Sequence, residues 1–360
     1  MLAYVGKRFL LMIPTLFGIL LINFAILQII PGGPVEQMMA KLKGHSALSN
    51  TQVVGHTSAL TPQNKSDLYR GAKGIEPRIL EKLKKQYGFD QPWTTRFWMM
   101  LKNYAIFDLG ESYTQHKNVS QLIIGCLPVS ISLGLWSTLL MYLISIPLGI
   151  KKAVKHGSTF DRWSSFIIIL GHAVPVFLLA ILLIILFAGG HYVQWFPLKG
   201  LISDHFESLS WWEKIIDYFW HITLPTLALT VGSFATLTVL TKNSFLEEIR
   251  KQYVTTAYAK GLNEKQVLKK HVFQNAMLII IASFPATFIG MFFTGSLLIE
   301  IVFSLKGLGY LGYHAAIARD YPVMMGSLYI FTLLGLILNL ISDLVYTWVD
   351  PRIHFDSKES

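Results

Sequence analysis

The sequence predicts an all-α integral membrane protein with six transmembrane helices and a large external loop between the first two. Composition is the first indication, because 52% of the 360 residues are hydrophobic and only 14% are charged, whereas about a quarter of residues are charged in soluble domains. The second is a set of six long apolar segments that carry almost no charge. They show no period-2 alternation, and a lone segment in lipid must satisfy its own backbone groups, so helices are expected.

The first segment, residues 9–30, has 22 residues without a charge. As a helix it would be about 33 Å long, enough to cross a hydrocarbon core of about 30 Å. It is long for a signal peptide and lacks a small-residue cleavage site, so residues 1–30 are expected to form a cytoplasmic tail and an uncleaved first span. The other five spans, which form the core over residues 127–349, are expected at about 127–150, 164–188, 222–241, 277–303 and 323–349.

Prolines occur inside the spans, where each removes one backbone hydrogen bond and tends to kink its helix. Such kinks either ease packing or line a cavity, and their recurrence favours a hollow or moving bundle over a plain anchor. The prolines concerned are Pro128, Pro147, Pro175, Pro225 and Pro285.

The distribution of Lys and Arg is the third indication and sets the orientation. The connection 151–163 holds four of them and 242–275 holds seven, against two each in 189–221 and 304–322. Basic residues in short loops mark the cytoplasmic side, which also places both termini and the tail 350–360 there. We therefore attribute the net charge of +10 to the orientation of the chain in the membrane rather than to binding of nucleic acid.

The connection 31–126 is external by the same alternation, because long loops cross the membrane regardless of charge. Within it, residues 41–70 are polar and without periodicity, which indicates a flexible excursion. Residues 79–87 place apolar side chains on one helical face, with Gly88 at the C-cap position. A short amphipathic helix is therefore expected in this external lobe.

The cytoplasmic connection 242–275 reads as helix, sharp turn and helix. Apolar residues at helical spacing lead up to Gly261, a plausible C-cap, and Asn263 with Gln266 resembles a capping box that starts the second helix. On the residues alone, a solvated hairpin and a rigid knob that docks on a partner are equally favoured.

The segment "YVTTAYAKGLNEKQVLKKHVFQNAM" resembles the EAA loop of ABC importer permeases, in the peptide-permease form "YVRTARAKGL…RHALRNAL". Thr255 stands where the general motif has Glu, Thr256 stands where it has the first Ala, Ala257 matches the second Ala, and Gly261 matches its Gly. Tyr258 replaces the Arg that is usual in peptide permeases. The resemblance extends through "RFLLMIPTLFGILLINFAILQIIPGGP", "YGFDQP", "FDLGESY" and "LIEIVFSLKGLGYLG…RDYPVMMG", with Lys306 where Pro is usual, and so covers essentially the full length.

Membership of the oligopeptide and dipeptide permease family implies the type I ABC importer permease fold and a role in peptide uptake. "PVSISLGLWSTL" and "LTKNSFLEEIRKQYV" look most like the Yej-type subgroup, which is associated with microcin C. The resemblance also implies a second homologous permease, two ATP-binding subunits or one fused tandem ATPase, and a periplasmic peptide-binding protein, in a bacterial inner membrane. It assigns ATPase coupling to Thr255, Thr256, Ala257, Tyr258, Ala259, Lys260, Gly261 and Leu262.

The sequence gives little support for an enzymatic function. No phosphate loop is present, so no cofactor is expected on this chain, and ATP with magnesium would bind a partner. "GLGYLG" lacks the strand and helix context of a dinucleotide site, and the one cysteine, Cys126, excludes an intrachain disulfide. No metal site or catalytic set is recognised. The main alternative is a self-contained secondary transporter or channel, which predicts mid-bilayer charges and internal repeats.

Four residues are candidates for the translocation path or its gate. His172 either faces a cavity or packs with a hydrogen bond, and the second is favoured. Glu300 either lines the path or pairs with Arg319 or Lys306, and a structural pair is favoured. Arg319 and Asp320 either hold the turn before Pro322 or meet a substrate-binding protein, with equal weight.

Overall fold

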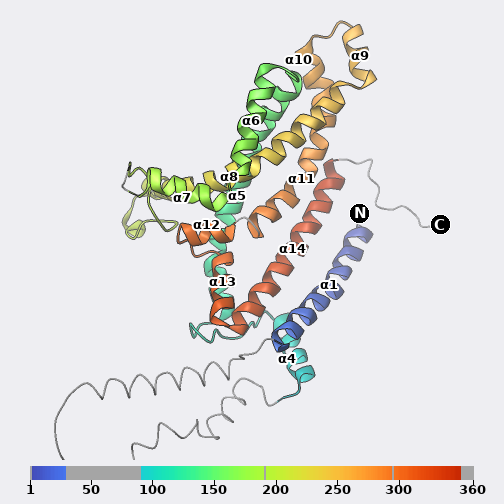
Figure 1. The fold of residues 1–360 in the computed structure, drawn as a ribbon. Helices are drawn as coiled ribbons and strands as arrows, with labels where there is room; N and C mark the ends of the chain where they lie inside the picture. The colour runs from blue at the N-terminus through green and yellow to red at the C-terminus, as the bar shows by residue number, and fades with distance from the viewer. Residues whose placement is uncertain (1, 30–90, 190–191, 294–295, 350–360) are drawn as a thin grey trace, which may run out of the picture. The chain divides into compact units, whose positions relative to one another are not determined.

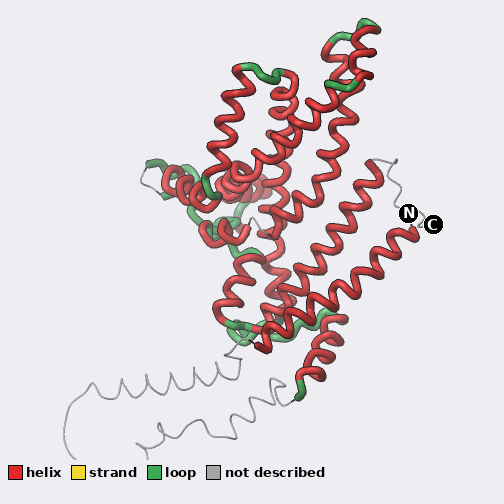
Figure 2. Tube along the Cα trace, turned by 45° about the vertical axis from the view of Figure 1, so that its right-hand side comes forward, coloured by secondary structure: helices red, strands yellow, loops and turns green. Residues whose placement is uncertain are grey.

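The computed structural model describes residues 2–29, 91–189, 192–293 and 296–349. Within these ranges the chain is helical, and one isolated bridge joins Glu111 to Asn118 (Figure 2). The predicted excursion 41–70 and the amphipathic helix 79–87 lie outside the described residues. The chain divides into two compact units, one formed by residues 1–16, 123–313 and 330–360 and the other by 17–122 and 314–329.

Helices account for the predicted spans (Figure 1). They are α1 (Leu2–Ile29), α4 (Trp93–Ala105), α5 (Val119–Val154), α6 (Thr159–Ala173), α7 (Val176–Phe187), α8 (Trp211–Ile249), α9 (Gln252–Ala259), α10 (Glu264–Val267), α11 (Phe273–Phe293), α12 (Ser296–Val302), α13 (Leu308–Ala318) and α14 (Tyr321–Val349), with a 3-10 turn η1 (Phe206–Ser208) and a π-helical turn η2 (Leu268–Val272). Among the described residues, five helices are long and apolar enough to cross a membrane, and the number is six when the bent pair of α6 and α7 is counted as one span.

The third predicted span is two helices rather than one. Between α6 and α7 the axis bends by 93°. Val174 is extended, with φ −80° and ψ 122°, because the ring of Pro175 disfavours the helical region for the residue before it. Pro128, Pro147, Pro225 and Pro285 stay inside their helices. One proline of the five therefore breaks its span.

The larger unit is organised around α8, which packs against α6, α7 and α11 (Figure 1). α8 approaches α5 closely at Gly149, where an added Cβ would lie 2.6 Å from Thr241 Cβ. Ser210 and Glu213 form a capping box at the start of α8. The buried core of this unit includes two clusters, one with Leu133 and Leu229 and one with Phe245 and Ile280.

The smaller unit holds α4 and the adjoining parts of α1, α5 and α14. Phe97 on α4 packs its ring on Phe17 and Phe24 of α1, with centroids 5.6 and 5.3 Å away. Tyr104 at the end of α4 packs on Tyr329 of α14, with centroids 5.1 Å apart. Aromatic contacts of this kind contribute about 0.5–1.5 kcal/mol beyond burial, so α4 is held by both neighbouring segments.

Candidate functional site

The predicted cytoplasmic turn is present between α9 and α10. Gly261 has φ +84°, the left-handed conformation that glycine adopts at helix C-caps. Its N–H donates to the Tyr258 carbonyl at 2.9 Å, and the Leu262 N–H donates to the Ala257 carbonyl at 3.3 Å. These bonds close the last turn of α9, so the prediction of a helix that ends at this glycine is confirmed.

The second helix begins as its sequence predicted. The Asn263 side chain accepts from the Gln266 N–H at 2.9 Å, and the Gln266 side chain accepts from the Asn263 N–H at 3.1 Å. Both bonds of a capping box are therefore formed. The helix then passes through η2, where the Phe273 N–H donates to the Leu268 carbonyl five residues earlier, and continues as α11.

The segment that leads into this turn is not the one continuous helix that the sequence predicted. The chain breaks after α8, because Lys251 is extended with ψ 151°. The Glu248 carboxylate accepts from the Lys251 ammonium and the Tyr253 hydroxyl across the break. The hydrogen bond to Glu248 raises the pKa of Lys251, and burial raises the pKa of Tyr253. Both groups therefore keep their protons at neutral pH, and α9 turns away from α8 as a separate element.

The residues that the resemblance assigns to ATPase coupling lie together on this projecting element, with one face inward and one outward. Val254 and Ala257 are 2% and 5% exposed and join the core between α8 and α11. The exposed positions are Thr255, Thr256, Tyr258, Ala259, Lys260 and Gly261, while Leu262 is half-buried. Thr255 occupies the place of the motif's Glu on the outward face, which therefore offers hydroxyl, aromatic and ammonium groups but no carboxylate.

His172 lines a cavity of about 360 Å³ in the larger unit, formed with residues of α5, α7, α8 and α11. The ring is exposed, and its Nδ1 lies 3.0 Å from the Gly232 carbonyl oxygen on α8. His172 is thus hydrogen bonded to α8 and also lines the cavity.

Glu300 is fully buried where α12 and α13 pack on α5. Its carboxylate accepts from the Ser130 hydroxyl at 3.1 Å and the Tyr310 N–H at 2.7 Å. A Cβ at Gly307 would lie 2.2 Å from Glu300 Oε1. These contacts give the carboxylate a packing role, and they identify a reason for glycine in "GLGYLG": the backbone must pass close to Glu300.

Asp320 is hydrogen bonded to the segment that precedes α5, within the smaller unit. Its carboxylate accepts from the Ser112 hydroxyl at 2.6 Å and the Thr114 hydroxyl at 2.8 Å, and from the Tyr113 and Thr114 N–H groups at 3.1 and 3.0 Å. It is 1% exposed, whereas Arg319 beside it is exposed and left-handed, with φ +50°. Asp320 thus has a structural role that joins two distant parts of the sequence.

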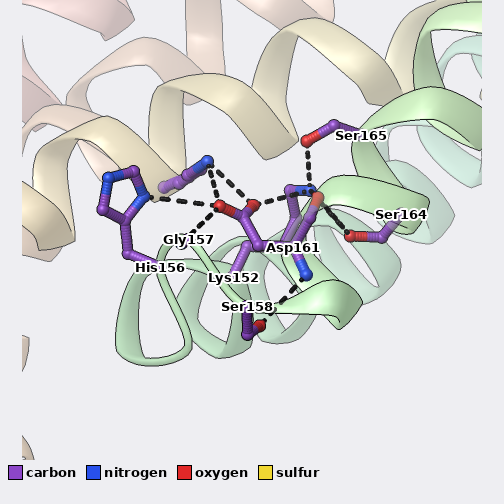
Figure 3. Close-up of polar contacts among 8 residues, drawn as sticks. Lys152, His156, Gly157, Ser158, Asp161, Ser164 and Ser165 are labelled. Atoms are coloured by element: carbon purple, nitrogen blue, oxygen red, sulfur yellow. Dashed lines mark hydrogen bonds and ion pairs between the residues drawn. The ribbon is translucent and has the colours of Figure 1, made fainter.

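A charged cluster around Asp161 was not predicted (Figure 3). Its carboxylate lies 2.8 Å from the Lys242 ammonium, 3.1 Å from that of Lys152 and 3.3 Å from His156 Nδ1, and it accepts from the Gly157 N–H at 3.1 Å. Lys152 and Asp161 have side chains only 1% and 6% exposed. Through these contacts the cluster holds the connection between α5 and α6 against α8. The one sequence signal for it is Ser158 followed three residues later by Asp161.

The described part of the chain contains no recognisable site for metal binding or cysteine chemistry. Among the residues of the four described ranges, no group of three or more His, Cys, Asp or Glu side chains could hold a metal ion. Cys126 is a half-buried free thiol on α5. The geometry is that of a helical membrane component with a projecting turn and a cavity.

Comparison with known proteins supports this description. Residues 145–355 match the family described as binding-protein-dependent transport system inner membrane component. The chain is 56% identical to the peptidoglycan transport system permease protein YejB of Agrobacterium fabrum, over 99% of both chains, and 58% identical to the inner membrane ABC transporter permease protein YejB of Escherichia coli O157:H7, over 99% of this chain and 100% of the relative. It is 32% identical to the oligopeptide transport system permease protein AppB of Bacillus subtilis, over 99% and 100% of the two chains.

A solved structure shares the fold. A chain of the MetNI methionine ABC transporter, in an inward-facing conformation, superposes with a TM-score of 0.50 at 17% identity, over 64% of this chain and 97% of the other. The predicted all-helical permease fold is confirmed. By the family match over most of its helical core and by its full-length relatives, the chain belongs to the inner-membrane components of binding-protein-dependent transport systems.

Proposed function

We propose that this chain is the permease subunit of an ATP-driven importer of peptides. It would line half of the translocation pathway, with a second homologous permease as the other half. A periplasmic peptide-binding protein would deliver substrate, and two ATP-binding subunits or one fused tandem ATPase would supply energy, with ATP and magnesium bound there. The names of the relatives, which include oligopeptide and peptidoglycan transport, support this class of substrate. The resemblance to the Yej-type subgroup extends it to microcin C-like peptides.

The observation that carries the proposal is the projecting turn from Thr255 to Leu262. Val254, Ala257 and the half-buried Tyr253 anchor α9 in the core, and the exposed residues of the turn offer hydroxyl, methyl, aromatic and ammonium groups to a partner. An exposed turn that is capped on both sides of Gly261 suits docking in a cleft of another subunit. The positive-inside distribution of Lys and Arg places this turn and both termini in the cytoplasm, where an ATPase would act.

Replacement of Gly261 by Val tests the coupling role. An added Cβ at Gly261 would meet no atom within 4 Å, but the positive φ strains a β-branched residue. Gly157, in the connection between α5 and α6, is a matched control, because its φ is +77° and its Cβ site is equally empty. Both variants should lose about 1–3 kcal/mol of stability, measured as melting temperature in detergent.

Coupling should separate the two variants. In proteoliposomes that contain the purified transporter, Gly261→Val should hydrolyse ATP without importing peptide, whereas Gly157→Val should import it near the parent rate. Full uptake by Gly261→Val would overturn the assignment of this turn. Purification without any ATP-binding subunit, together with uptake driven by an ion gradient, would instead favour the secondary-transporter alternative.

A further inference from the structure

The cavity beside His172 has an unusual lining for a membrane helix bundle. It measures about 360 Å³, within the range of small-molecule sites. None of its twelve lining residues is Asp, Glu, Lys or Arg. Five are nevertheless polar and come from α6, α8 and α11: His172, Ser233, Thr236, Ser283 and Thr287. The site therefore combines hydrogen-bonding groups with the absence of a full acidic or basic charge.

These polar groups lie in the middle of apolar spans. Thr236 is exposed on α8 and Ser233 is half-buried, whereas Thr226 and Thr238 on the same helix are buried and donate to carbonyls one turn earlier, at 2.8 Å in each case. A hydroxyl that faces hydrocarbon is energetically unfavourable, because lipid tails offer it no hydrogen-bond partner. The cavity face of α8 is thus suited to water or a polar ligand.

The polar set contains both donors and acceptors. The Gly232 carbonyl can only accept, so the contact at 3.0 Å places a proton on His172 Nδ1 and makes Nε2 the acceptor of the neutral ring. The hydroxyls of Ser233 and Thr236 can donate. A peptide unit presents one N–H donor and one carbonyl acceptor, which is complementary to this set. Val176, Leu229 and Leu240 supply apolar wall for a small side chain.

We propose that this cavity is a substrate-contact site that holds an uncharged segment of the transported peptide. Its backbone N–H and carbonyl groups would meet His172 and the α8 hydroxyls, and a small apolar side chain would meet the walls. This inference rests on the proposed function, because it specifies where the imported peptide touches this subunit.

Water access is the first test. Cys126 is the single cysteine, so a Cys126→Ser parent gives a clean background for Thr236→Cys and for Leu227→Cys, a control that is exposed on α8 but outside the cavity lining. A charged methanethiosulfonate reagent should modify Thr236→Cys and leave Leu227→Cys unmodified. Equal lack of reaction at the two positions would show that lipid covers the cavity and would overturn the inference.

Substrate contact is the second test, with tri-alanine as the probe. Tri-alanine should slow modification of Thr236→Cys in the assembled transporter during ATP turnover. The double variant Ser233→Ala with Thr236→Val should raise the KM for tri-alanine uptake about tenfold, as expected for lost hydrogen bonds to substrate, whereas Leu227→Ala should not.

The outcomes separate this inference from the function on which it rests. No protection and an unchanged KM, in a transporter whose parent form imports tri-alanine, would overturn the contact site alone. A parent transporter that imports no peptide would overturn the proposed function, and this inference with it.

Discussion

Asp161 holds two ammonium groups and an imidazole around one nearly buried carboxylate. Replacing it with Asn keeps the shape but leaves the Lys152 ammonium, 1% exposed, without its counter-charge. Removing one partner of a buried pair costs about 3–5 kcal/mol, since the other charge stays buried. Asp161→Asn should therefore lower the free energy of unfolding by about that amount, measured by thermal denaturation of the purified chain in detergent.

The Lys214–Glu207 pair provides a control for this prediction. Its charges lie 3.6 Å apart, and the Glu207 side chain is 96% exposed. Exposed pairs contribute about 0–1 kcal/mol, so Glu207→Gln should leave the melting temperature nearly unchanged. An equally small effect of Asp161→Asn would show that the lysines find other partners or water when the carboxylate is lost.

The π-helical turn η2 adds one residue to the helix that carries the projecting turn into α11. Deleting the exposed Lys269 should turn the Phe273–Leu268 bond into an ordinary α-helical one and leave the Thr255–Leu262 turn in nearly the same orientation. Deleting both Lys269 and Lys270 removes one residue more and should rotate that turn by about 100° about the axis of α11. ATP-driven uptake should be kept in the single deletion and lost in the double deletion, because the outward face then no longer meets the ATPase. Normal uptake by the double-deletion variant would show that the rotational setting of this turn is unimportant.

At the level of the helices, the caps could be predicted from the sequence, but two helix breaks could not. Asn263, Gln266 and Gly261 act through neighbours within a few residues, so their sequence pattern was sufficient. The break at Lys251 depends on Glu248 accepting from two groups, and the bend at Pro175 depends on how the chain packs after the kink. A proline pattern predicts a lost hydrogen bond, but it does not distinguish a kink from a bend of 93°.

Orientation in the membrane gives a prediction for the entire chain. In the Cys126→Ser background, Lys155→Cys, Lys199→Cys and Lys260→Cys place one exposed thiol in each of three connections. The positive-inside distribution predicts that an impermeant maleimide labels only Lys199→Cys in right-side-out vesicles, and the other two in inverted vesicles. The parent should stay unlabelled. Labelling of Lys260→Cys from outside would reverse the topology and remove the proposed ATPase contact.

The family and its helical core were predictable from the sequence because motifs and apolar spans are local. The functions of single ionisable residues were not. Asp320 meets Ser112 and Thr114 across about two hundred positions of sequence, and Asp161 meets Lys242 from another helix. Such pairs form when distant segments pack, and no spacing rule joins them. The hydrogen bond of His172 to the Gly232 carbonyl and its place in the cavity lining likewise depend on how α6 packs on α8.

The close crossing of Gly149 and Thr241 has a mechanical consequence. A contact this tight opposes sliding and leaves rotation as the easier relative motion of α5 and α8. Thr241 lies eight residues from the end of α8 at Ile249 and thirty from its start at Trp211, distances of about 12 and 45 Å at 1.5 Å per residue. When α8 rotates as a rigid body about this contact, its two ends move by different amounts, because the contact lies near one end. A displacement of about 1 Å at the end beside the Thr255–Leu262 turn would move the other end by nearly 4 Å.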